Sequence, residues 1–389
     1  MGVSLHDEYV GTASRLALLA GVAWRQVMLA WRQAMLAWCQ AMQPSRDAAL
    51  PALLTIGVFS PMAIGALLGY LKRADVHEIQ GDVTTADAER YARDGVVVLR
   101  GAIQADVVDG VRAALESARA GSGLFSGKMG DHGGWTDKFL WRAVPAVRAL
   151  ALESPLVEAV AKLMNTRRTN LLYDHVCVKE PGDTAPTLWH HDINYLPVEP
   201  PDAFASAWLA LDDVGVLQGR LEFVRGSHLW KNNDGTSCRF TPMDFPTMSA
   251  VTDDAWLHPE KPSRRGFEPL PDINACRSRY DVVSCDVRSG DVLVFHGLTL
   301  HYSAGNADPH RRRRGISLRY TGESARFTPR NKGIATGWPT PGPAALLRPG
   351  DPLTCDIWPL AYEAAESGLE ASESGSASLA HARGETEGC

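Results

Sequence analysis

The stretch Trp189-His190-His191-Asp192 decides how the rest of the chain is interpreted. In an extended segment, side chains at positions i and i+2 project from one side of the backbone, and the side chain at i+1 projects from the other. His190 and Asp192 are therefore expected to point together, with His191 on the opposite side. An imidazole nitrogen and a carboxylate oxygen that share a side are two ligands of a mixed N/O metal site. Such a site needs a third ligand from elsewhere in the chain.

Two later histidines are candidates for that third ligand. Residues 290–301 read as a buried strand that runs into a turn, and they contain His296 and His301. Four arginines at 311–314 follow, directly before a strand-like segment at 315–318. Two histidines and one carboxylate on one face of Fe(II) leave positions open for a 2-oxo acid and dioxygen. A guanidinium suits the far carboxylate of such an acid, because it binds carboxylates in a bidentate manner.

Composition narrows the class of protein. The chain has 389 residues, 45% of them hydrophobic, which is enough for one large domain with accessory segments. Its net charge of −6 argues against general nucleic-acid binding, so no nucleic-acid partner is predicted. Seven cysteines without a C-x-x-C pair argue against a disulfide framework or a zinc ribbon. We predict reduced thiols and a small-molecule partner.

Residues 1–75 form a leader that differs from the rest of the chain. Between Trp24 and Met42, Trp and Met alternate at spacings of four and three, which places them in one stripe on a helix. This helix is rich in arginine and poor in acidic residues. The pattern is typical of an organelle transit segment or of a helix lying on a membrane surface; a tandem duplication with little function is the third interpretation.

The second half of the leader is apolar. Residues 48–71 carry no charge, and ~20 apolar residues suffice to cross a bilayer. Pro51 and Pro61 weaken a single spanning helix, because no neighbouring helix satisfies a broken hydrogen-bond ladder. The leader therefore predicts membrane association or organelle targeting, with a cytoplasmic location as the alternative.

The globular domain is predicted to span residues 76–362, followed by an acidic, disordered tail at 363–389. Helical patterns come first and short strands follow. The helices are expected at 85–92, 103–118, 145–152 and 155–164, and the strands at 171–178, 205–211, 221–224, 282–287, 292–295 and 316–320. This order predicts a barrel or double-sheet core with helices packed on one side.

Taken in order, the motifs resemble the phytanoyl-CoA dioxygenase family. The resemblance covers roughly residues 84–327. The segments that carry it are Ala92–Gly101, Trp189–Asp192, Ala207–Asp213, Arg225–His228 and Gly290–Ser303. It implies a mainly β fold with flanking helices, a double-stranded β-helix or jelly roll. It also implies oxygenation that depends on Fe(II), 2-oxoglutarate and dioxygen.

Carried over by position, the resemblance implies that His190, Asp192 and His301 are the iron ligands, with His296 as the rival to His301. The arginine that binds 2-oxoglutarate is Arg313 by strand register, whereas counting forward from the last histidine selects Arg312. Three further residues match positions around the co-substrate: Trp208, Ser303 and His175.

The implied reaction is hydroxylation of a small molecule, with a lipid or an acyl-CoA ester as candidate substrates, and release of succinate and CO2. Family members that halogenate have a small residue in place of the carboxylate ligand, so Asp192 favours hydroxylation. Two alternatives stay open. One is a jelly-roll binding protein that keeps the metal site without turnover, and the other is an iron enzyme with a different co-substrate.

Overall fold

The structure, a computed structural model, describes residues 75–120, 127–129, 133–240, 268–328, 347–354 and 358–365. The predicted leader helix, the apolar segment at 48–71 and the tail from residue 366 lie outside these residues. Within the described ranges, no helix has the length and apolar character needed to cross a bilayer.

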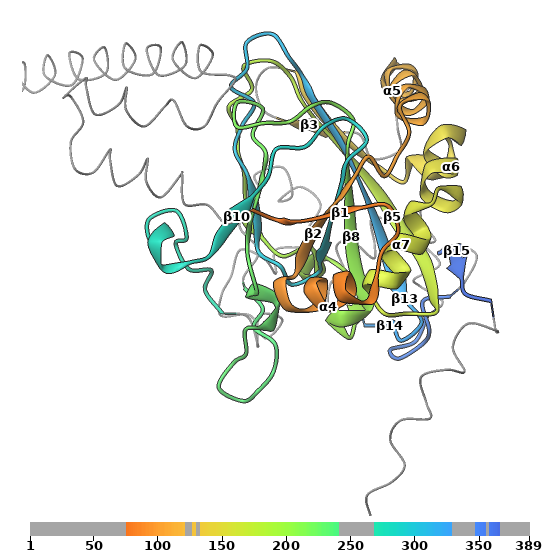
Figure 1. The fold of residues 1–389 in the computed structure, drawn as a ribbon, viewed down its shortest axis with the longest axis vertical. Coiled ribbons are helices and arrows are strands. Elements are labelled where there is room, and N and C mark those ends of the chain that lie inside the picture. Colours follow the sequence, from red (N-terminus) through yellow and green to blue (C-terminus); the bar gives the residue numbers. More distant parts are fainter. Residues whose placement is uncertain are drawn as a thin grey trace, which may run out of the picture. The chain divides into compact units, whose positions relative to one another are not determined.

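Two β-sheets form the framework (Figure 1). The larger sheet has the order β1-β2-β11-β8-β13-β5-β4-β3, with β15 also paired to β5, and the smaller sheet has the order β10-β9-β12-β6. The larger sheet comprises β1 (His77–Gln80), β2 (Val96–Arg100), β3 (Gly127–Met129), β4 (Gly134–Lys138), β5 (Arg168–Lys179), β8 (Phe204–Ala210), β11 (Val292–His296), β13 (Arg313–Gly322) and β15 (Leu360–Glu363). The smaller sheet comprises β6 (Thr187–His190), β9 (Leu221–Val224), β10 (Val282–Ser284) and β12 (His301–Ser303). A separate pair joins β7 (Val198–Glu199) to β14 (Arg326–Phe327).

The chain passes back and forth between the two sheets. From β5 onward, β5, β8, β11 and β13 join the larger sheet, while β6, β9, β10 and β12 join the smaller one. An apolar cluster contains side chains from both sheets, including Trp208 and Phe295 of the larger sheet and Phe223 and Val283 of the smaller. This alternation is the double-stranded β-helix, so the predicted jelly roll is confirmed.

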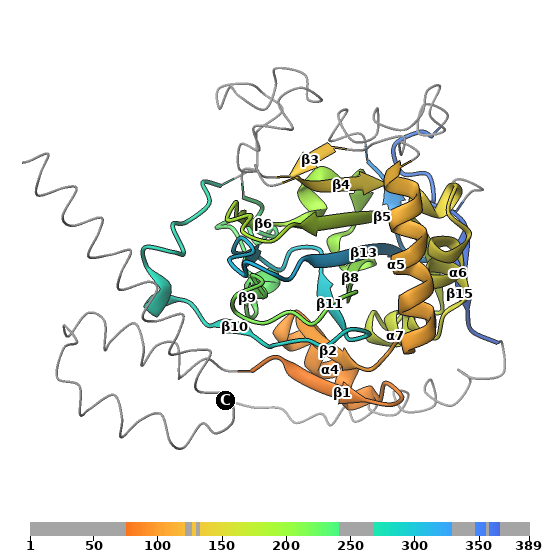
Figure 2. The ribbon, with the colours of Figure 1, turned by 90° about the horizontal axis from the view of Figure 1, so that it is seen from above.

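Helices cover the outer face of the larger sheet. Figure 2 shows α5, α6 and α7 on one side of β5, β8 and β13, with strands of the smaller sheet on the other. The α-helices are α4 (Thr85–Asp94), α5 (Ala105–Ala120), α6 (Pro145–Glu153) and α7 (Leu156–Leu163). Short 3-10 turns are η2 (Leu140–Arg142), η3 (Asp192–Tyr195), η4 (Pro201–Ala203), η5 (Ser227–Leu229) and η8 (Arg277–Arg279).

The first described helix, α4, begins at Thr85 as predicted and ends at Asp94, two residues beyond the predicted end. The Thr84 hydroxyl accepts from the amide of Asp87, whose carboxylate accepts from the Thr84 amide in return. This capping box satisfies two amides that a helix start leaves without partners. Gly95 ends the helix with φ of 78°, a left-handed conformation that glycine adopts without steric cost.

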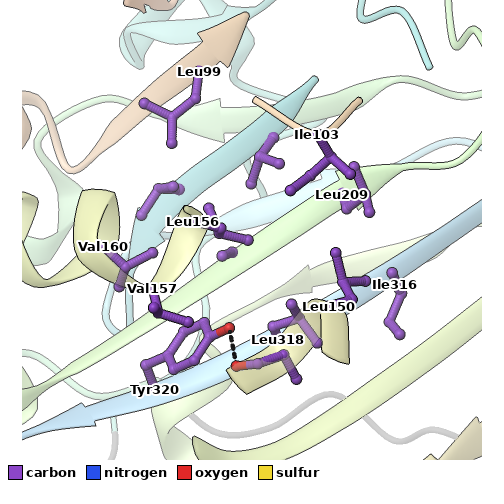
Figure 3. Close-up of a cluster of buried hydrophobic side chains, with 14 of the residues drawn as sticks. Leu99, Ile103, Leu150, Leu156, Val157, Val160, Leu209, Ile316, Leu318 and Tyr320 are labelled. Atoms are coloured by element: carbon purple, nitrogen blue, oxygen red, sulfur yellow. Dashed lines mark hydrogen bonds between the residues drawn. The ribbon is translucent and has the colours of Figure 1, made fainter. Parts of the chain in front are cut away.

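The main hydrophobic core lies between the helices and the larger sheet (Figure 3). Along β13, Ile316, Leu318 and Tyr320 alternate with residues of the other face and pack in this core. The Tyr320 hydroxyl donates to the carbonyl of Ala151 at 2.9 Å, so this buried phenol is hydrogen-bonded. The residues on the other face of β13 point into the interior between the two sheets.

Several predicted bounds differ from the structure. Strands β5 and β13 are longer than predicted, because each pairs with a neighbouring strand on both edges. The strand predicted at 282–287 ends at Ser284, and Val287 makes only an isolated bridge to Val214. On α5, Val107 is 40% exposed and lies off the buried stripe. Strand β15 ends at Glu363, one residue inside the predicted tail.

We expect Leu209→Ala to lower the free energy of unfolding by about 2–5 kcal/mol, because it leaves a cavity at a fully buried position of this core. Equilibrium urea unfolding followed by circular dichroism measures the change. Val107→Ala is the matched control and is expected to change stability by no more than about 0.5 kcal/mol. Equal losses in the two variants would contradict the assigned core.

Candidate metal centre

Strand pairing brings His190 and His301 face to face. Strand β12 runs antiparallel to β6, with His301 directly opposite His190. The two ring centroids are 4.1 Å apart. Asp192 follows in the turn η3, and its Oδ1 lies 3.7 Å from Nε2 of His190 and 3.8 Å from Nε2 of His301. One donor atom from each residue lies within 4.8 Å of the others.

Backbone carbonyls fix the orientation of both imidazoles. Nδ1 of His190 donates to the carbonyl of Leu188 at 2.7 Å, and Nδ1 of His301 donates to the carbonyl of Thr299 at 3.0 Å. Each ring therefore turns its Nε2 lone pair toward Asp192. Such second hydrogen bonds set the tautomer and the orientation of histidines that bind metals.

The carboxylate of Asp192 is buried and held by two donors from the larger sheet. Ser206 on β8 donates to Oδ2 at 2.6 Å, and Arg319 on β13 donates to Oδ1 at 2.8 Å. Burial opposes ionisation of Asp192, but the positive charge of Arg319 and the neighbouring histidines outweigh it and hold the pKa of the carboxyl well below its usual value. Burial, reinforced by His190, lowers the pKa of His301 to about 3.

This donor set fits ferrous iron. At neutral pH it offers a neutral imidazole at His301 and an ionised carboxylate at Asp192, and their ligand atoms lie within 4.8 Å of each other. With His190 this makes two nitrogens and one oxygen, the combination typical of non-haem Fe(II) oxygenases, which leaves coordination positions open. Among the described residues, this is the one group of three acidic, histidine or cysteine side chains with metal-binding geometry.

The other histidines of the sequence motifs lie outside this group. His296 is buried at the end of β11, where it donates from Nε2 to Asp202 at 3.1 Å. His228 donates to the carbonyl of Ala92 at the end of α4. His191 is not part of this group; it is 1% exposed, and its ring lies 5.2 Å from that of Phe240.

A buried guanidinium lies on the inner face of β13. Arg313 is 3% exposed, and its Nε has no hydrogen-bond partner within the described residues. Its guanidinium carbon lies 5.0 Å from the centre of the Trp208 ring. Burial lowers the pKa of Arg313 to about 10, so the side chain stays charged at neutral pH. A charged group with an unused buried donor fits an anionic ligand.

Gly315 gives the Trp208 ring its position. A Cβ at residue 315 would lie 2.2 Å from Cζ2 of Trp208, which is far inside van der Waals contact. The indole therefore lies where any other residue at 315 would project. This close approach explains a glycine between two inward-facing positions of β13.

Arg312, the alternative anchor, lies on the surface. Its side chain is 32% exposed and pairs with Glu180 at 2.8 Å and Glu116 at 2.6 Å. Arg311 and Arg314 likewise pair with acidic residues, Asp308 and Asp212. Of the four consecutive arginines, Arg313 is the one turned into the interior.

Ser303 and Lys179 lie near Arg313, the first residue of β13. Lys179 lies opposite Arg313 in the sheet and donates to the carbonyl of Ala304 at 2.9 Å, with Oγ of Ser303 at 3.5 Å. Burial and then the charge of Arg313 lower the pKa of Lys179 to about 7. The Ser303 hydroxyl itself donates to the carbonyl of Gly219 at 2.8 Å. The predicted serine thus lies beside Lys179, which is the strand neighbour of Arg313.

His175 lies on the inner face of β5. Its Nε2 donates to the Thr136 hydroxyl at 2.6 Å, because that hydroxyl donates its own hydrogen to the carbonyl of Val176. Lys138 is opposite His175 in the sheet, and burial, with Arg319 nearby, lowers the pKa of its ammonium. These groups line the interior on the β4 side.

Sequence reasoning did not single out Lys138, Ser206 or Arg319. Period-two alternation along β13 was the available signal for Arg319, because it puts residues 313, 315, 317 and 319 on one face. For the other two, the signal is weak, since β4 was not predicted and a single serine in a buried strand has no distinctive pattern.

Comparison with known proteins identifies the family. The phytanoyl-CoA dioxygenase family model matches residues 91–315, more than half of the chain. Phytanoyl-CoA dioxygenase domain-containing protein 1 of Danio rerio is 27% identical over 158 residues, which cover 39% of this chain and 45% of that protein. The Mus musculus protein of the same name is 27% identical over 175 residues, 43% of this chain and 50% of its own. The chain thus spans about half the length of the curated relatives that it matches.

Solved structures agree on the fold. The epimerase SnoN from nogalamycin biosynthesis, described as non-haem and α-ketoglutarate-dependent, is 26% identical with a TM-score of 0.53, covering 72% of this chain and 96% of that one. SnoN has also been solved in complex with Fe3+, α-ketoglutarate and nogalamycin RO. The carbocyclase SnoK, at 24% identity and a TM-score of 0.54, shares the fold over 72% of this chain and 99% of its own. With the matched family model, the jelly roll and the His/Asp/His group, the chain belongs to the phytanoyl-CoA dioxygenase family of Fe(II)- and 2-oxoglutarate-dependent oxygenases.

Proposed function

We propose that this protein oxidises a small molecule with Fe(II), 2-oxoglutarate and dioxygen, and that His190, Asp192 and His301 hold the iron. The observation that carries the proposal is the meeting of their three donor atoms within 4.8 Å. The fixed Nε2 orientation of both rings supports it, because a structural histidine pair does not require both lone pairs to converge.

When bound, the iron and 2-oxoglutarate supply the oxidising power: 2-oxoglutarate and O2 become succinate and CO2, and one oxygen atom is available to the substrate. The chain binds and orients. Arg313 binds the carboxylate of 2-oxoglutarate far from the metal, with Trp208, Ser303 and His175 around it. The burial of Arg313 supports this role, because a charge-assisted bond is stronger where water is excluded.

The proposed reaction is hydroxylation. Asp192 is an ionised carboxylate at the position where halogenating members of the family have a small residue. Branched acyl-CoA esters and other lipids are the first candidate substrates, as expected for the family. The nogalamycin enzymes SnoN and SnoK, named an epimerase and a carbocyclase, make oxidation of a natural product the second candidate.

For the metal, we expect His190→Ala, Asp192→Ala and His301→Ala each to weaken Mn(II) binding by about 100-fold or more, because each removes one of three ligands. Electron paramagnetic resonance of free Mn(II) measures the affinity. His296→Ala is the matched control and should bind like the parent protein. Loss of binding in the His296 variant with retention in the His301 variant would reverse the assignment.

For turnover, the full-length protein with Fe(II) and 2-oxoglutarate is expected to release succinate slowly in air, and faster with its substrate. A panel of acyl-CoA esters, fatty acids and aromatic natural products, scored by succinate, tests this. Asp192→Ala is the control and should release none. A parent protein that binds Mn(II) but never consumes 2-oxoglutarate would be a binding protein instead.

For the co-substrate, Arg313→Met is expected to raise the KM for 2-oxoglutarate about 30-fold or more, because it removes one partner of a buried charge pair. Arg312→Met removes a surface ion pair and should leave that KM close to the parent value. Steady-state succinate formation gives KM and kcat separately. An unchanged KM in the Arg313 variant would favour an iron enzyme with another co-substrate.

A further inference from the structure

We propose that Arg319 is a positioning residue of the metal centre, which holds the Asp192 carboxylate so that Oδ1 alone faces the metal. The inference rests on the proposed function, because it treats Asp192 as an iron ligand. It adds a residue from the larger sheet to a centre whose ligands come from β6, η3 and β12.

The two carboxylate oxygens of Asp192 have different surroundings. Oδ1 is the oxygen near both imidazoles, 3.7 Å and 3.8 Å from their Nε2 atoms, and it also accepts from Nη2 of Arg319 at 2.8 Å. Oδ2 accepts from Ser206 at 2.6 Å. Arg319 and Ser206 are direct neighbours across β13 and β8, so their backbones set the spacing of the two donors. Together they prevent the carboxylate from rotating.

Arg319 has no other acidic partner within the described residues. It is 6% exposed, its Nε and Nη1 lack hydrogen-bond partners, and its guanidinium carbon lies 4.8 Å from the centre of the Tyr173 ring. A buried ion pair is seldom more stabilising than apolar residues of similar volume. Arg319 is buried and forms its one ion pair among the described residues with Asp192 Oδ1, so we assign it a role in the metal site rather than in stability.

The arrangement has an electrostatic consequence. The positive charge of Arg319 competes with a divalent cation for Oδ1 and repels it at short range. Its removal should therefore tighten metal binding, even though it releases the carboxylate from its fixed orientation. An arginine that only supported the fold would have the opposite effect, because its loss would disorder the ligands and weaken metal binding.

The test is titration of the full-length protein with Co(II) alone, followed by visible absorption. We expect Arg319→Met to bind Co(II) about fivefold tighter or more than the parent, with changed d–d band intensities, because Asp192 can then offer both oxygens. Arg319→Lys should return the affinity toward that of the parent. The exposed Arg311→Met is the matched control and should leave the affinity and the spectrum unchanged.

Thermal unfolding checks that each variant is folded. Tighter Co(II) binding by a folded Arg319→Met, reversed by Arg319→Lys, supports the positioning role. Equal or weaker Co(II) binding by a folded Arg319→Met, with an unchanged spectrum, overturns it. Failure of the proposed function would be seen in a different assay. A parent protein that binds Co(II) but releases no succinate when supplied with Fe(II) and 2-oxoglutarate contradicts the oxygenase, whatever the result for Arg319.

Discussion

The antiparallel pairing of β6 with β12 is the constraint on which the metal centre depends. It places two histidines that are more than a hundred positions apart directly opposite each other, at the distance of a cross-strand pair. A shift of one residue would turn one imidazole to the opposite face of the sheet. The register is held on the far side as well, because His301 also pairs with Phe223 on β9. The smaller sheet thus fixes two ligands before any metal binds.

The third ligand ties that sheet to the larger one. A carboxylate this deeply buried is costly unless it is hydrogen-bonded, and the donors to Asp192 come from β8 and β13. The centre is therefore formed where the two sheets meet, and neither sheet contains all of it. This explains why its charge balance involves Arg319, which lies 18 residues beyond the last histidine of the motif.

A feature of the site can be predicted from the sequence when the residues that form it are close together in the chain. Local alternation was sufficient to predict that His190 and Asp192 lie together, because the two residues are only two positions apart and the chain is extended up to Asp192, where η3 begins. The choice between His296 and His301 depended on a family resemblance, since both follow a buried strand, and the pairing with β6 supports His301. Arg319 could not be recognised without knowing that β13 lies beside β8, which is a contact between distant segments. His191 lies between the two ligands in the sequence but is buried against Phe240 and does not belong to the group of three.

Strand β13 shows why stability and chemistry are linked in this fold. Its outer residues pack under the helices, and its inner residues include Arg313, Gly315 and Arg319. Both faces are buried, so the strand cannot move to suit one of them without disturbing the other. The helices that cover the outer face therefore do more than bury apolar surface. By holding β13 against β5 and β8, they keep the two guanidinium groups and the Trp208 ring at fixed places in the interior between the sheets.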